Sequence, residues 1–252
     1  MFQNPFSLYL NTSYDRIMYD EKYIPENIDK VGKALKTNFN RNILMALIIL
    51  AVIGLASSLY AWREPRAPFD LPITLWFQSF DSRTLRSTMV WVSYIFSSWR
   101  IALIVTAASF VLWRIWGREE AIFLAIAGIV STIHVAIKLA IHRPRPLANL
   151  VQIFSIETTE GYPSGHAFAS ILIFGFLLYL ILTLVPQRSL RIISLIFFPL
   201  LILLIGASRI FLGVHWTTDV LGGYIIGGFF LTGLIWLYER LKQRPSWINK
   251  PR

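Results

Sequence analysis

The chain has 252 residues, of which 55% are hydrophobic and 15% charged, and its formal net charge is +10 at pH 7. Soluble domains are roughly 45–50% apolar, so this composition favours a membrane protein. The sequence contains no cysteine, which excludes disulfides, thiolate metal sites and a cysteine nucleophile. In a membrane protein, excess positive charge reports topology and attraction to anionic lipid, so we expect no nucleic-acid partner.

Residues 1–41 are too polar to span a membrane and are expected to form a cytoplasmic tail. Ile28, Val31 and Leu35 fall on one face of a helix that would begin near Pro25. This pattern predicts either an amphipathic helix at the membrane surface or a solvated tail. The apolar run that follows lacks the small-residue cleavage pattern of a signal peptide, so we expect it to be retained as a helix.

Six apolar segments follow, and each approaches the roughly 20 residues that a transmembrane helix needs. They cover Asn42–Trp62, Trp99–Trp116, Ala121–Ile141, His166–Val185, Leu190–Ile210 and Thr217–Leu237. The sequence shows none of the roughly 10-residue alternating segments that are typical of a transmembrane barrel. It therefore predicts an all-α protein with a six-helix transmembrane domain over residues 42–238 and a basic tail over 239–252.

The longest connection between predicted spans covers residues 63–98. Asp70, two residues before Pro72, is typical of a helix start. Trp76, Phe77 and Phe80 are aromatic residues of the kind that favour the membrane interface. We therefore predict an interfacial helix here, and we expect residues 86–98 to extend the second span outwards.

Basic residues gather in the N-terminal tail, in the connections after spans two and four, and in the C-terminal tail. The positive-inside rule then places both termini in the cytoplasm, and we expect the host membrane to be a bacterial cytoplasmic membrane. Three polar clusters fall on the other, outer side. Ionisable residues at membrane depth are costly and mark functional sites.

The cluster closest to the C-terminus contains Arg209, His215 and Asp219. Residues four apart share one face of a helix, so a carboxylate is expected beside the imidazole of His215. Such a carboxylate fixes the tautomer and leaves the other ring nitrogen free to act as a nucleophile. Arg209 supplies a charged fork suited to phosphate oxygens. A structural Asp–Arg pair bracing spans five and six is the alternative.

The middle cluster, Pro163-Ser164-Gly165-His166, precedes an apolar run and is typical of a helix start. Free N–H groups at a helix N-terminus bind anions, and a glycine lets the ligand approach the backbone. Imidazole titrates near neutrality, which suits His166 to general acid–base work. A simple N-cap followed by a histidine at headgroup level is the alternative.

The first cluster contains Lys138 inside the third span and Arg145 just beyond it. Pro144 and Pro146 end the helix, so Arg145 can turn towards the same site while Lys138 extends outwards. Ordinary basic flanking of a span is the alternative. His134 and His142 are weaker candidates for a functional role.

Two glycines in the sixth span, Gly223 and Gly227, are spaced for close helix packing. A dimer face is the alternative reading, and the sequence fixes no oligomeric state.

Taken in order, these motifs resemble the three-part signature of the type 2 phosphatidic acid phosphatase (PAP2) family. The signature is carried by Lys138 with Arg145-Pro146, by Pro163-Ser164-Gly165-His166, and by Ser208-Arg209 with His215 and Asp219. The resemblance covers roughly residues 120–235. The vanadium haloperoxidases are similar at the site alone, so we expect vanadate to inhibit here.

The resemblance implies a role for each residue of the signature. His215 would attack phosphorus and form a phosphohistidine, Asp219 would orient it, and His166 would protonate the leaving oxygen. Lys138, Arg145, Ser164, Gly165 and Arg209 would hold the phosphoryl oxygens. Charge stabilisation by these groups serves phosphoryl transfer, so we expect no metal or other cofactor.

The expected function is hydrolysis of a phosphate or diphosphate ester on a membrane lipid. Undecaprenyl diphosphate, phosphatidylglycerophosphate, phosphatidic acid and diacylglycerol pyrophosphate are all candidate substrates, and an outward-facing site favours the first. A lipid phosphotransferase using the same intermediate is one alternative, and a non-catalytic lipid transporter or scaffold is another.

Overall fold

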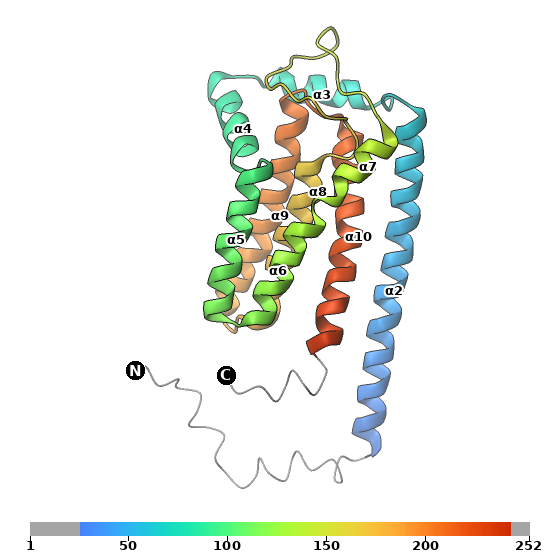
Figure 1. Ribbon diagram of the computed structural model, residues 1–252, viewed down its shortest axis with the longest axis vertical. Helices are drawn as coiled ribbons and strands as arrows, with labels where there is room; N and C mark the ends of the chain where they lie inside the picture. The colour runs from blue at the N-terminus through green and yellow to red at the C-terminus, as the bar shows by residue number, and fades with distance from the viewer. Residues whose placement is uncertain (1–25, 243–252) are drawn as a thin grey trace. The chain divides into compact units, whose positions relative to one another are not determined.

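The computed structural model describes the backbone of residues 26–242 and the side chains of residues 40–97 and 99–242. Within the described residues every regular element is a helix, which confirms the predicted all-α fold (Figure 1). The helices are α2 (Glu26–Arg63), α3 (Asp70–Ser79), α4 (Arg83–Ile95), α5 (Ser98–Ile115), α6 (Arg118–Val130), α7 (Ile133–Ile141), α8 (Gly165–Leu184), α9 (Arg188–Phe211) and α10 (Thr217–Lys242).

In the described part of the chain, five helices are long and apolar enough to cross a membrane, and a bent pair makes a sixth candidate span. The five are Asn40–Arg63 within α2, Arg118–Ile141 across α6 and α7, and then α8, α9 and α10. The sixth joins α4 to α5 with a bend of 63°. Residues 86–98 thus adjoin the second span as expected, but as a separate helix, because Ser97 has an extended backbone between α4 and α5.

Helix α2 is longer than the sequence predicted, since it begins at Glu26 rather than near Asn42. The helix begins directly after Pro25, near which the sequence predicted a helix start, and proline is favoured at the beginning of helices. The side chains of Ile28, Val31 and Leu35, which would form the apolar face of the predicted surface helix, lie outside the described side chains. The same is true of residues 1–25 and 243–252.

Helix α8 is the centre of the compact unit that begins at Ala46, and it packs against α6, α9 and α10. It is apolar on all sides, as expected for a buried helix. A Cβ on Gly227 would come within 2.8 Å of the Phe168 carbonyl oxygen, and one on Gly223 within 2.7 Å of that of Ser164. The two glycines therefore allow α10 to approach α8 closely, as predicted.

The third span is not one continuous helix, because α6 ends at Val130 and α7 begins at Ile133. The hydroxyls of Ser131 and Thr132 each donate to the carbonyl three residues earlier, at 2.7 Å. Side chains that bond locally to the backbone in this way compete with the helical ladder. The break ends six residues before Lys138, on the segment that carries the first polar cluster.

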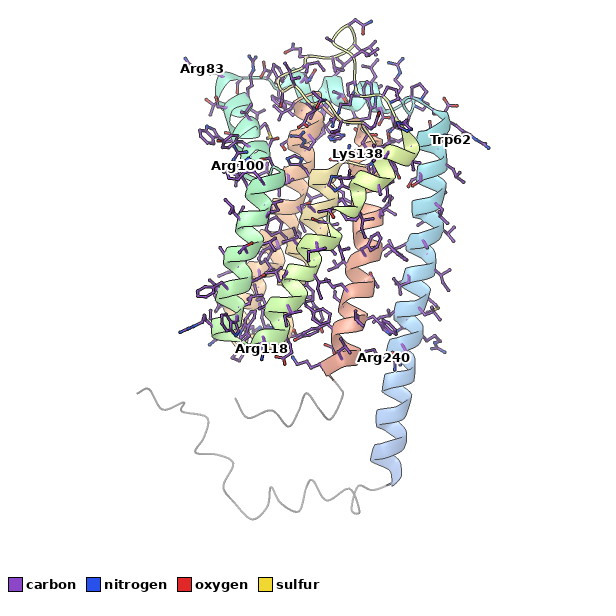
Figure 2. The ribbon with its side chains drawn as sticks, in the orientation of Figure 1. Trp62, Arg83, Arg100, Arg118, Lys138 and Arg240 are labelled. Carbon is purple, nitrogen blue, oxygen red and sulfur yellow. The ribbon has the colours of Figure 1, made fainter. Side chains whose placement is uncertain are left out.

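Helix α3 begins at Asp70 as predicted, and it packs against α9 and α10 across their ends (Figure 1). The end of α7, the start of α8, the end of α9 and the start of α10 all carry the polar motifs. Lys138 lies at this end of the helices, whereas Arg118 lies at the other end (Figure 2). The fold therefore brings three distant sequence segments to one end of the bundle.

Candidate active site

A cavity of about 130 Å³ lies among these helix ends. Its polar lining includes three basic side chains, three histidines and one carboxylate: Lys138, Arg145, Arg209, His134, His166, His215 and Glu157. The backbone of Gly165 also lines it. The three motifs identified in the sequence thus contribute to one enclosed, cation-rich space.

His215 presents an unprotonated nitrogen to Arg145. Its Nε2 lies 3.3 Å from Arg145 Nη1, and a guanidinium can only donate, so Nε2 accepts. The ring proton then resides on Nδ1, which faces Asp219 Oδ2 at 3.5 Å. In this tautomer Nε2 carries a lone pair, which can attack an electrophile once the Arg145 N–H turns to another acceptor.

Burial and neighbouring cations lower the pKa of His215 well below its ordinary value of 6.5. Desolvation is the larger cause, and the positive charges of Arg145, Arg209 and Lys138 add to it. Both effects disfavour the imidazolium form. The side chain is 2% exposed, so the neutral ring is held away from bulk water.

Asp219 lies behind His215 rather than on the cavity wall. Its Oδ2 accepts from the backbone N–H of Trp216 at 2.9 Å, and its Oδ1 accepts from Arg143 at 2.5 Å. The prediction that His215 and Asp219 share a helix face is wrong in detail, because α10 begins at Thr217. The carboxylate instead folds back to cap its own helix, and this brings it to the imidazole.

His166 lies in the first turn of α8 and lines the cavity. Its Nε2 is 3.2 Å from the carbonyl oxygen of Ser93 on α4. A carbonyl can only accept, so this contact requires a proton on Nε2. The proton of His166 is therefore on the nitrogen held by α4, a helix without any of the predicted site residues.

Arg145 and Arg209 are held in place by backbone and side-chain acceptors. Arg145 donates to the Val214 carbonyl at 2.5 Å and to Thr159 Oγ1 at 3.0 Å. Burial lowers the pKa of Arg145, but a guanidinium stays protonated. Arg209 donates to Ser93 Oγ and to Glu157 Oε1, while its Nε has no partner among the described residues.

Glu157 is the acidic side chain that faces these cations. Its carboxylate lies 2.5 Å from Arg209 and 4.0 Å from Arg145, and its side chain is 30% exposed. Because the cavity lining has three basic side chains and one carboxylate, the site retains an attraction for an added anion.

Lys138 turns from α7 towards the loop that precedes α8. Its Nζ donates to the carbonyl of Glu160 and lies 3.4 Å from that of Gly161. These acceptors carry no formal charge, so the ammonium still contributes a positive charge to the cavity. Lys138 is 6% exposed, which is deeper than ordinary basic flanking of a span would place it.

The start of α8 presents the helix N-terminus to this region. Ser164 occupies the N-cap position, and its buried Oγ has no hydrogen-bond partner in the described structure. Ser164 does not line the cavity itself, whereas Gly165 does. A Cβ on Gly165 would lie 2.5 Å from His134 Nε2, so only glycine fits between this turn and α7.

The remaining histidine of the sequence analysis lies elsewhere. His142 is 66% exposed and its Nδ1 is 3.3 Å from Glu160 Oε1, outside the cavity. His134, in contrast, lines the cavity and is fixed by a contact of 2.6 Å between its Nδ1 and the Ser131 carbonyl.

Sequence reasoning missed four residues at or behind the site: Asp70, Ser93, Arg143 and Glu157. Asp70 was predicted only as a helix start, and Arg143, two residues before Arg145, was given no role. Both side chains are completely buried. Neither their burial nor their pairing can be recognised from the sequence alone. Ser93 and Glu157 lie in segments without any motif.

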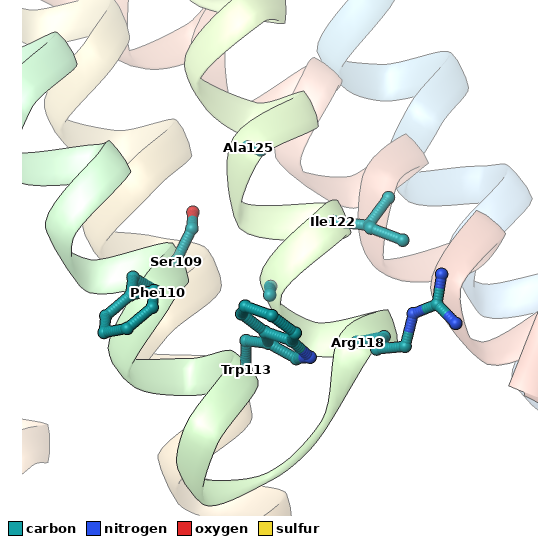
Figure 3. A pocket seen from close by; sticks show the side chains of 7 residues that line it. Ser109, Phe110, Trp113, Arg118, Ile122 and Ala125 are labelled. Carbon is teal, nitrogen blue, oxygen red and sulfur yellow. The ribbon is translucent and has the colours of Figure 1, made fainter.

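A second hollow of about 320 Å³ lies between α5 and α6 at the opposite end of the bundle (Figure 3). Phe110, Trp113 and Ile122 line it, with Arg118 at one side. It contains no histidine and no acidic side chain among its lining residues. It therefore lacks the groups that acid–base or nucleophilic chemistry needs.

A helical membrane protein with three histidines and three basic side chains around one small cavity has the architecture of an integral-membrane phosphatase. The model of the PAP2 superfamily matches residues 119–243 of this chain. The chain belongs to the PAP2 superfamily, and it is a membrane lipid phosphatase.

Relatives of known identity agree with this assignment. Phosphatidylglycerophosphatase B of Bacillus subtilis (strain 168) is 29% identical over 153 residues, which cover 57% of this chain and 70% of that protein. The crystal structure of a PAP2-type phosphatidylglycerolphosphate phosphatase from Bacillus subtilis has a TM-score of 0.63 at 21% identity, covering 78% of this chain and 98% of that one. Aquifex aeolicus LpxE has a TM-score of 0.53 at 22% identity, covering 68% and 96%.

Proposed function

We propose that the enzyme hydrolyses a phosphate ester of a membrane lipid through a phosphohistidine formed on His215. The observation that carries the proposal is the contact of His215 Nε2 with Arg145 at 3.3 Å. Because a guanidinium can only donate, this contact requires an unprotonated Nε2, and its lone pair becomes free for attack when a phosphate group takes the Arg145 N–H instead. Neutral Nε2 is the form that can attack phosphorus.

In the proposed reaction Nε2 of His215 attacks phosphorus, and the bond between phosphorus and the lipid oxygen breaks. His166, which carries a proton on each ring nitrogen when the anionic substrate is bound, gives its Nδ1 proton to that leaving oxygen while Nε2–H stays on the Ser93 carbonyl. Water then attacks the phosphohistidine, His166 accepts a proton from this water, and inorganic phosphate leaves. Lys138, Arg145 and Arg209 offset the charge on the phosphoryl oxygens, which is the main requirement of phosphoryl transfer.

The helix N-terminus adds uncharged donors to this set. Ser164 and Gly165 begin α8, and the free N–H groups of a helix start attract an anion. The Oγ of Ser164 has no partner among the described residues, which is consistent with donation to a phosphoryl oxygen when substrate is bound.

Among the candidate lipids, we propose phosphatidylglycerophosphate as the first substrate to test. The support is the identity of 29% with a Bacillus subtilis protein named phosphatidylglycerophosphatase B. Undecaprenyl diphosphate and phosphatidic acid are the comparison substrates, because a cavity of about 130 Å³ lined by basic side chains suits the phosphate group that all three lipids share.

Purified enzyme in detergent tests the mechanism. We expect phosphate release from these lipids to vanish in His215→Ala and to persist in His142→Ala, whose side chain is exposed and outside the cavity. Substrate carrying radioactive phosphate should label wild-type protein transiently, with the label on histidine. Activity in His215→Ala would refute the mechanism, and transfer to an acceptor lipid without phosphate release would indicate a phosphotransferase.

We also propose that the site faces the outer side of a bacterial cytoplasmic membrane, with both termini in the cytoplasm. The support is the basic content of the opposite end, where Arg118 lies (Figure 2). Because the chain has no cysteine, Asn149→Cys and Arg188→Cys can be labelled singly in intact cells. We expect an impermeant maleimide to label the first directly and the second only after permeabilisation; the reverse result would invert the topology.

A further inference from the structure

A buried network of hydrogen bonds and ion pairs lies behind the catalytic pair and connects three segments of the chain. Asp70 at the start of α3, Arg143 after α7 and Asp219 in α10 contribute its charged groups. The side chains of all three are 0% exposed. None of them lines the cavity, so they do not hold the phosphate themselves.

Arg143 connects the two carboxylates. Its Nη1 donates to Asp219 Oδ1 at 2.5 Å, and its Nη2 donates to Asp70 Oδ2 at 3.3 Å. A further bond of 2.6 Å reaches Thr218 Oγ1, and Nε lies 3.3 Å from the Glu64 carbonyl. A guanidinium held by this many acceptors has one orientation, which fixes the Asp219 carboxylate as well.

Asp70 is bound from several directions. Its Oδ1 accepts from the backbone N–H of Thr218 at 2.9 Å. Its Oδ2 accepts from Thr218 Oγ1 at 2.7 Å and from the N–H of Ala67 at 2.7 Å. All of these partners donate, so Asp70 is an ionised carboxylate that both caps α10 and faces Arg143.

The charges of the network do not cancel. Two carboxylates against one guanidinium leave a net charge of −1 buried beside His215. A ring that becomes phosphorylated on Nε2 while Nδ1 keeps its proton becomes positively charged. A buried negative charge next to it stabilises that state more than a neutral Arg–Asp pair would.

We propose that Asp70 and Arg143 are positioning residues for the nucleophile. Arg143 fixes the carboxylate of Asp219. Asp70 offsets the positive charge of Arg143, so that the three side chains together keep a net negative charge beside His215. This inference rests on the proposed role of His215 as nucleophile.

Asp70→Asn in the full-length enzyme tests the proposal, because the amide keeps the shape of the carboxylate and removes its charge. We expect kcat for phosphatidylglycerophosphate to fall about 10- to 100-fold, the usual effect of losing a group that orients a reactive ligand. KM should stay near the wild-type value, because the cavity cations are unchanged. Asp81→Asn is the matched control, since Asp81 pairs with Arg86 outside the network and should keep wild-type kcat.

A double-variant cycle separates positioning from a structural role. If Asp70 acts through Asp219, then Asp70→Asn should have no further effect on kcat in an Asp219→Asn background. A merely structural role at the start of α10 would lower kcat by the same factor in both backgrounds. That result, or a wild-type kcat for Asp70→Asn, would overturn the proposal.

A second variant applies if Asp70→Asn does not yield folded protein. Arg143→Lys keeps the charge but loses the fork that spans both carboxylates, and the same cycle with Asp219→Asn has the same two outcomes. Comparison with His215→Ala distinguishes the two levels of inference. An active His215→Ala enzyme refutes the proposed function, whereas an inactive one with normal Asp70→Asn and Arg143→Lys variants refutes only the positioning network.

Discussion

His215 Nδ1 lies 3.5 Å from Asp219 Oδ2, and the same carboxylate oxygen accepts from the N–H of Trp216 at 2.9 Å. The backbone therefore fixes the carboxylate before any substrate binds. His215 Nε2 contacts Arg145, whereas Nδ1 faces the carboxylate without a hydrogen bond among the described residues. This arrangement assigns the two ring nitrogens different tasks.

The first prediction concerns Asp219→Asn. An amide placed with its nitrogen towards the ring would favour the opposite tautomer, with the proton on Nε2 and no lone pair for attack. We expect kcat to fall about a thousand- to ten-thousand-fold, the scale found when the orienting acid of a catalytic triad becomes an amide. Steady-state phosphate release measures this loss.

Thermal unfolding in detergent is the companion measurement for Asp219→Asn. An amide with its nitrogen at the Oδ2 position loses the acceptor for the Trp216 N–H, so we expect a lower unfolding temperature in a protein that still folds and is inactive. Activity within tenfold of the wild type would show that Asp219 does not orient the nucleophile.

The second prediction concerns Gly165→Ala. The added methyl group would lie 2.5 Å from His134 Nε2 and 2.7 Å from Cδ2 of the same ring. Either the start of α8 or the imidazole must then move, and displacements near 1 Å at reacting groups cost about 100-fold in rate. We expect a loss of this size in kcat/KM for phosphate release.

A second substitution tests the cause of that loss. In a His134→Ala background the methyl group has space, so Gly165→Ala should lower kcat/KM much less than it does in the wild-type background. Gly228→Ala is the matched control, because a Cβ there meets no atom within 4 Å. An equal loss in both backgrounds would exclude the clash with His134 as its cause.

The sequence was sufficient to predict the helical class and the motifs, because apolar length and local spacing depend on neighbouring residues. It placed Lys138, Arg145, Arg209, His166 and His215 in one site, and the structure brings all five to one cavity. Long-range pairs such as Asp70 with Thr218 cannot be recognised in the same way, because neither residue belongs to a local pattern.

Backbone detail was also beyond local reasoning. The break at residues 131–132 follows from two hydroxyls that bond back to their own helix, within a segment apolar enough to be predicted as continuous. The bend between α4 and α5 likewise interrupts an apolar stretch. In both places hydropathy predicts an apolar segment but does not predict where the helix within it breaks or bends.

The third prediction concerns packing of α10 on α8. A Cβ on Gly227 would come within 2.5 Å of Ile171 Cγ2 and 2.8 Å of the Phe168 carbonyl oxygen. A carbonyl of a neighbouring helix cannot move alone, so Gly227→Ala should lower stability by about 1–3 kcal/mol, as overpacking does. Thermal unfolding in detergent, compared with Gly228→Ala, measures this difference, and equal unfolding temperatures would contradict the close packing.

The fourth prediction concerns metal ions. Lys138, Arg145 and Arg209 supply positive charge to the cavity, and such groups can stabilise the transition state of phosphoryl transfer by themselves. We therefore expect phosphate release to continue in EDTA. The assay compares chelated enzyme with the same enzyme after Mg²⁺ addition; activity lost on chelation and restored by Mg²⁺ would show that the three side chains are insufficient. Vanadate should inhibit by occupying the same cavity.

The fifth prediction concerns the protonation of His215, whose pKa is lowered by burial and by neighbouring cations. An unfolded histidine takes up a proton near pH 6.5, whereas this ring should remain neutral as the pH falls through that value. Stability contributed by the neutral ring is therefore fully present above about pH 6.5 and is lost progressively as the pH falls, because the unfolded state then binds the extra proton. NMR of enzyme with ¹⁵N-labelled histidine can follow this ring, identified by the signal that disappears in His215→Asn. A neutral-imidazole signal persisting below pH 6.5 is the expected result, and protonation at or above that pH would contradict the electrostatic description of the cavity.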